Sequence, residues 1–135
     1  MLKKFKNEKG QALVEFALIL PILLILVCGI IDFGWLFYHQ SELNNCAREG
    51  ARYAIVNTGK TDRIALIQNK VNNTASSSIK PITITITYSN LQTPLLGDVT
   101  LTLTSNVKVL TPLTGIFVDN QRVALTAQAT MKVES

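Results

Sequence analysis

Few residues of this 135-residue chain have side chains suited to catalysis or metal binding. It contains one histidine, His39, and two cysteines, Cys28 and Cys46. A metal centre or a Cys/His catalytic pair would have to be built around His39, and the nearest thiol, on Cys46, lies about two helical turns further on. The acidic residues are scattered, and no Gly-rich phosphate loop, paired-carboxylate cleft or Cys/His cluster is present. We therefore expect no enzyme, no metal and no cofactor, and interpret His39 as a polar residue at a membrane interface.

The charged residue with the most unusual setting is Glu15. Residues 12–31 are apolar apart from this glutamate. As a helix they would be about 30 Å long, which is the thickness of a bilayer core. An ionised carboxylate inside such a segment costs roughly 2.5–3.5 kcal/mol on insertion scales, and this cost points to a function for the charge. The alternative is that Glu15 is tolerated because its side chain extends to the lipid headgroups.

Positive charge is concentrated just before the apolar segment. Residues 1–9 contain four lysines and one glutamate, whereas the rest of the chain has nine basic and eight acidic residues. After the segment, the first basic residue is Arg48. Because basic residues flanking a span stay in the cytoplasm, we predict a single-pass protein with a cytoplasmic N-terminus and an extracytoplasmic C-terminal part. The nearly neutral remainder has no basic stripe, which argues against nucleic-acid binding.

Two kinds of cleaved signal are alternatives to a retained membrane helix. A secretory signal has a basic head and an apolar middle, but this apolar segment is longer than usual, carries a charge and lacks a small-residue cleavage site. A lipoprotein signal would end at Cys28, but the residue before it, Val27, is not small. Both observations favour a helix that stays in the membrane.

The residues around Glu15 resemble a known processing motif. A glycine after a basic head, then four residues and a glutamate in an apolar helix, is similar to the cleavage motif of type IV prepilins, here Gly10 to Glu15. The run Gly10-Gln-Ala-Leu-Val-Glu-Phe16 and the alanine- and arginine-rich residues 47–54 more closely resemble the TadE/TadG-like minor pseudopilins of the tight-adherence (Tad/Flp) type IV pilus system.

This resemblance implies a structural subunit that takes part in assembly or priming of a Tad/Flp-type pilus. A prepilin peptidase would cleave between Gly10 and Gln11, and Glu15 and Phe16 would act in assembly. The implied partners are that peptidase, other pilins and pseudopilins, the inner-membrane assembly platform and membrane lipid. The subunit would reside in the cytoplasmic (inner) membrane and could enter a surface pilus. The alternative is a single-pass anchored protein with an extracytoplasmic adhesive or sensing β-domain and no role in a pilus.

The elements that would carry this motif form an α+β chain that begins with a long helix. Residues 1–10 are predicted to be a basic leader, and residues 11–56 a membrane-spanning helix with an extracytoplasmic extension that ends near residues 57–59. In the extension, apolar or small residues recur on one helical face: Leu36, Leu43, Ala47, Ala51 and Ala54. Pro21 is predicted to kink the span. On one helix Cys28 and Cys46 would be about 27 Å apart, too far for a disulfide within one chain, although Cys46 could pair between subunits.

Residues 57–135 are predicted to form a second, short helix and a three-stranded antiparallel β-meander. The helix is expected over Thr61–Ser76, capped by Thr61 or Asp62, with this apolar stripe: Ile64, Ile67, Val71 and Ala75. Residues 82–88, 99–109 and 123–133 alternate with period two, apolar on one face and threonine-rich on the other. Loops with Pro94 and Gly97, and with Pro112 and Gly115, separate these strands. The two helices would cover the apolar face of the sheet.

Overall fold

The computed structural model describes residues 8–90, 97–112 and 119–133. The predicted leader up to residue 7, and the predicted loop residues Pro94 and Gly115, lie outside these ranges. The elements follow in this order: α1 (Glu8–Val56), α2 (Arg63–Thr74), the 3₁₀ turn η1 (Ser77–Ile79), β1 (Ile82–Tyr88), β2 (Gly97–Lys108), η3 (Asp119–Gln121) and β3 (Arg122–Val133). The predicted α+β architecture is confirmed.

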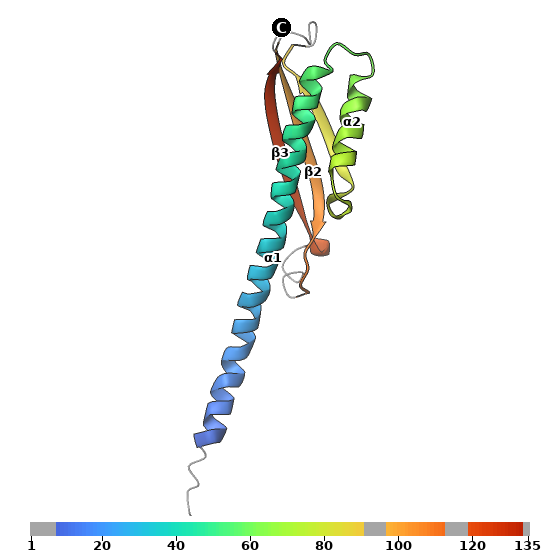
Figure 1. Ribbon diagram of the computed structural model, residues 1–135. Coiled ribbons are helices and arrows are strands. Elements are labelled where there is room, and N and C mark those ends of the chain that lie inside the picture. Colours follow the sequence, from blue (N-terminus) through green and yellow to red (C-terminus); the bar gives the residue numbers. More distant parts are fainter. Residues whose placement is uncertain (1–7, 91–96, 113–118, 134–135) are drawn as a thin grey trace, which may run out of the picture.

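Helix α1 has two halves with different surroundings. Figure 1 shows that its first half projects alone, whereas its second half packs against α2 and the strands. We call this packed part, which comprises the described residues from 32 to 133, the body. The most apolar window of α1 has no buried residue, and its length and composition fit a membrane span. The helix continues on both sides of Pro21. Cys28 and Cys46 are both free on this one helix, as predicted.

The sheet is a meander in the order β1-β2-β3, with antiparallel neighbours. Its register aligns residues of one kind across all three strands. Ile84, Leu103 and Ala127 form one row of the inner face. On the outer face the rows are threonine-rich, and the hydroxyl groups of Thr100 and Thr130 are 2.9 Å apart. The alternation predicted from the sequence therefore gives an inner apolar face and an outer polar face.

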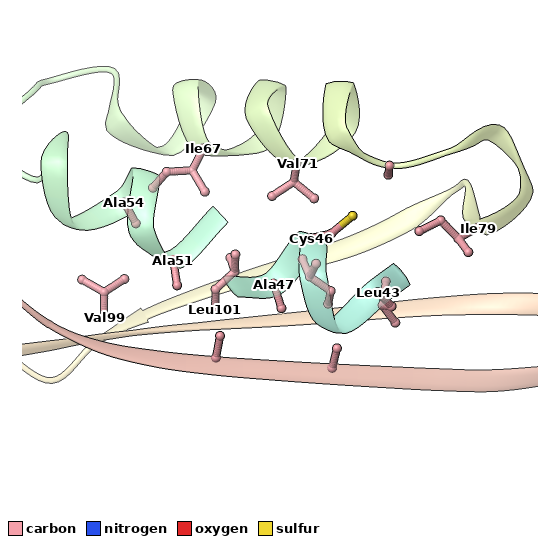
Figure 2. Packing of buried hydrophobic residues seen from close by; sticks show 14 of the residues in the cluster. Leu43, Cys46, Ala47, Ala51, Ala54, Ile67, Val71, Ile79, Val99 and Leu101 are labelled. Carbon is pink, nitrogen blue, oxygen red and sulfur yellow. The ribbon is translucent and has the colours of Figure 1, made fainter. Parts of the chain in front are cut away.

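The core lies on the inner face, where α1 is sandwiched between α2 and the sheet (Figure 2). The predicted face of α1 is largely confirmed, since Leu43 and the alanines at 47, 51 and 54 are fully buried. From α2, Ile67 and Val71 complete the core. The predicted stripe is wrong at Ile64, which lies in the first turn of α2 and is 52% exposed. Asp62 occupies the N-cap position without a side-chain capping bond.

Gly50 sets how closely α1 approaches both neighbours. A Cβ at this position would clash with the side chain of Leu101 and lie 2.8 Å from Val71 Cγ2, and both of these side chains are fully buried. We expect Gly50→Ala to lower the free energy of unfolding by about 1–2 kcal/mol, because overpacking outweighs the gain of roughly 1 kcal/mol in helix propensity. Denaturant unfolding followed by Trp35 fluorescence measures this.

The matched control is Gly34→Ala on the same helix, where a Cβ would meet nothing within 4 Å. This variant should keep or raise stability, by up to about 1 kcal/mol. Equal effects of the two substitutions would contradict the steric role of Gly50.

Candidate functional site: the start of α1 and its junction with the body

The predicted processing residues lie in the first described turns of α1. The bond between Gly10 and Gln11 lies inside the helix, close to its start at Glu8. Glycine lowers helix propensity, so Gly10 weakens α1 directly at the bond that is predicted to be cleaved.

The predicted assembly residues Glu15 and Phe16 are exposed on the projecting half of α1. Gln11 Nε2 donates a hydrogen bond to Glu15 Oε1, one helical turn away, at 3.2 Å. Glu15 takes part in neither of the two ion pairs found among the described residues. Phe16 is 59% exposed. The carboxylate and the aromatic ring are thus available to lipid or to a neighbouring subunit, and the four predicted residues lie together on one stretch of helix.

At the end of the apolar segment, Asp32 fastens α1 to the chain that leaves β2. Asp32 Oδ1 accepts hydrogen bonds from the backbone N–H groups of Leu110 and Thr111, both at 2.9 Å. Asp32 Oδ2 accepts a further hydrogen bond from the Thr111 hydroxyl. The residue is only 3% exposed. These three hydrogen bonds link residues that are far apart in the chain.

Two more side chains of α1 extend this link to the strands. Trp35 Nε1 donates to the backbone carbonyl of Lys108 at 3.1 Å, and Gln40 Nε2 donates to that of Thr126 at 2.9 Å. We call Asp32, Trp35 and Gln40, with the backbone groups they bind, the junction. Sequence reasoning did not identify it. Its one visible signal was an aspartate directly after the apolar segment.

The interpretation of His39 as an interfacial residue is wrong, because the side chain is 1% exposed within the body. Its ring packs edge-on against Trp35 and Tyr38, with centroid distances of 4.3 and 5.2 Å. His39 Nδ1 lies 3.4 Å from Glu42 Oε2, and Glu42 Oε1 accepts the Ser76 N–H at 2.8 Å. Burial opposes ionisation of Glu42, but the hydrogen bonds from Ser76 and His39 lower the pKa of its carboxyl below the ordinary value. Through Glu42, α1 is therefore hydrogen-bonded to the residue Ser76, just after α2.

Cys46 and Glu49, two further residues of α1, interact with other parts of the body. Cys46 is 1% exposed, so its thiol is not accessible for the alternative of pairing between subunits. Burial, together with the nearby carboxylates of Glu42 and Glu49, raises the pKa of that thiol. Glu49 forms an ion pair with Lys70 of α2 at 3.1 Å. Within the described ranges no group of three potential metal ligands occurs.

Residues 10–52 match the family described as TadE-like protein. This segment is TadE-like. The match begins at Gly10 and lies wholly on α1. It agrees with the resemblance seen in the residues and is consistent with a protein of the Tad pilus system. No curated protein and no solved structure matches the chain.

The TadE-like segment contains both parts of the candidate site. It includes Gly10, Gln11, Glu15 and Phe16 at one end, and the three junction side chains further along. The TadE-like segment also supplies the buried alanine at position 47 and Leu43, on which the sheet packs. The strands themselves lie outside the match. The match therefore covers a helix with one exposed apolar half and one half that packs against the body.

Proposed function

We propose that this chain is a minor pseudopilin, a structural subunit that takes part in assembly or priming of a Tad/Flp-type pilus. Residues 1–10 are its leader, 11–56 its membrane-spanning helix and extension, and 57–135 the rest of an extracytoplasmic body. The N-terminus lies in the cytoplasm. The observation that carries the proposal is the TadE-like match over a helix whose apolar half is bare and bears Glu15.

Cleavage gives the role of Glu15 a physical basis. After removal of the leader, Gln11 would carry a positively charged α-amino group. The Gln11 side chain already lies 3.2 Å from Glu15 Oε1, so this amine would be on the adjoining turn of the same helix. Within a filament, the amine of one subunit meets Glu15 of the next, which neutralises a charge that is costly in an apolar setting. This pairing would set the axial register between neighbouring helices.

The partners follow from this chemistry. A prepilin peptidase removes the leader, other pilins and pseudopilins of the Tad system pack against the apolar half of α1, and the inner-membrane assembly platform receives the subunit. Membrane lipid surrounds the same surface before assembly. The major pilins of this class consist of little more than the helix. The additional body of this chain therefore favours the minor type.

One observation favours the alternative of an anchored adhesive or sensing protein. The outer face of the sheet is left uncovered by the helices, and its residues, such as Thr83, Thr85 and Thr87, are exposed. A polar face of this kind is available to a surface or ligand. The two candidate functions share a topology and differ in whether the chain is processed after Gly10.

We expect the protein recovered from membranes, when expressed with its cognate peptidase, to lack residues 1–10 and to begin at Gln11. The reason is the position of Gly10 between a basic head and an apolar helix with Glu15 at the prepilin spacing. Intact mass spectrometry measures the product directly. A Gly10→Leu variant is the matched control, and its mass should still include the leader. A wild-type mass that includes residues 1–10, or a cut near Cys28, would favour the anchored alternative.

A further inference from the structure

The ladder between β2 and β3 ends in two positive charges directly opposite each other. Lys108 and Arg122 are register partners in its last pair, and both side chains are exposed on the outer face. Like charges facing each other across strands destabilise a sheet. Among the side chains that the structure describes, neither of the two forms an ion pair. An anion from outside the chain would relieve this repulsion.

An exposed leucine lies beside this basic pair. Leu110 is 54% exposed, although it is a large apolar residue. Its backbone N–H is held by Asp32 at 2.9 Å. Residue 110 is therefore fixed at the level of α1 where the apolar segment ends. Figure 1 shows this lower end of β2 directed toward the projecting half of α1.

The heights of these residues agree with the thickness of a lipid headgroup layer. With the span ending at Ile31, Asp32 and therefore Leu110 lie at the boundary of the hydrocarbon core. Lys108 precedes Leu110 by two residues, which is about 7 Å along an extended chain. The headgroup region on one side of a bilayer is about 5–7 Å deep. Long basic side chains at that height extend to lipid phosphates.

We propose that this end of the body rests on the outer leaflet of the cytoplasmic membrane. Leu110 enters the boundary between headgroups and acyl chains, and Lys108 and Arg122 bind the phosphates of anionic lipids. The inference rests on the proposed membrane span of α1, and adds a second, peripheral contact to it. Together the two contacts fix the angle between the body and the bilayer. Extraction of the subunit from the membrane must break the peripheral contact.

The test uses the full chain in liposomes, either neutral or containing phosphatidylglycerol, with single spin labels introduced in a Cys28→Ala, Cys46→Ala background. The proposed contact is probed by Leu110→Cys. Val56→Cys is the matched control, because Val56 is an apolar residue with 80% exposure at the far end of α1. Ile25→Cys reports on the span itself. The readout is relaxation by oxygen, which concentrates in lipid, against relaxation by a water-soluble nickel complex.

We expect the label at position 110 to be reached by oxygen and shielded from nickel in anionic liposomes, and the label at 56 to show the reverse. Each basic residue at an anionic surface favours the bound state about fivefold. In the double variant Lys108→Gln, Arg122→Gln, the ratio of lipid-exposed to water-exposed label at position 110 should therefore fall about thirtyfold. A label at 110 that is fully open to nickel, while 25 is in lipid, overturns the inference and leaves the span intact. A label at 110 shielded from both relaxants indicates protein contact and also overturns it. A label at 25 in water overturns both the span and the inference.

Discussion

Replacing Asp32 with alanine should lower the free energy of unfolding of the body by about 3 kcal/mol or more. The substitution removes the acceptor of three hydrogen bonds and leaves the N–H groups of Leu110 and Thr111 without it. Each of these part-buried hydrogen bonds contributes about 1 kcal/mol, and more where the acceptor is charged. Denaturant unfolding in detergent, followed by Trp35 fluorescence, gives the magnitude, and amide hydrogen exchange at residues 110 and 111 gives the location.

The isosteric variant Asp32→Asn is the control for this result. It keeps one carbonyl oxygen as acceptor, and we expect roughly half of the loss because only the charge and one acceptor are removed. The exchange rates at residues 110 and 111 should rise in both variants and most in Asp32→Ala. If Asp32→Ala unfolds at the wild-type denaturant concentration, the junction does not stabilise the body.

The largest functional effect is expected from Glu15→Gln. The variant keeps the size of the side chain and removes its charge, so insertion into the membrane should be unchanged or easier. Cleavage after Gly10 should continue at least in part. Pilus yield, or co-purification with other pilus subunits, should fall by at least tenfold, since losing one close charge pair between subunits costs more than the 1.4 kcal/mol that corresponds to that factor.

A matched control is available on the same helix. Glu49→Gln makes the same chemical change in an exposed ion pair. Glu49 pairs with Lys70, and the Glu49 side chain is 54% exposed. Such surface pairs contribute little, so pilus yield and stability should stay near wild type. If the variant of residue 15 also assembles at wild-type yield, its carboxylate is only tolerated in the membrane, and the anchored alternative gains support.

The periodic parts of the fold could be predicted from the sequence. Alternation of apolar residues and threonines predicted the three strands and the face of each residue, because a sheet with one buried face imposes period two on its sequence. Helical spacing of small residues identified the face of α1 that carries Leu43 and its alanines. The candidate residues Gly10, Gln11, Glu15 and Phe16 could be proposed from the sequence because the motif that they resemble is local: a fixed spacing within one helix.

The junction and the histidine environment could not be predicted in this way. Asp32 and Thr111 are separated by 79 positions, and such a pairing leaves no periodic trace in either segment. His39 lies beside an apolar span, which suggested an interface, but its side chain is only 1% exposed in the folded body. These differences all arise from contacts between elements.

The junction also determines when the body can finish folding relative to its synthesis. Gln40 binds the backbone of Thr126, 86 residues later, so the contact order between α1 and β3 is high. Non-local pairing of this kind requires loop closure before any stabilising contact forms, and it is slow. In a chain that is inserted as proposed, α1 is therefore anchored long before its last partner strand has been synthesised. The part of α1 that packs on β3 stays uncovered during that interval, and folding of the body is completed only after synthesis has reached the C-terminal strand.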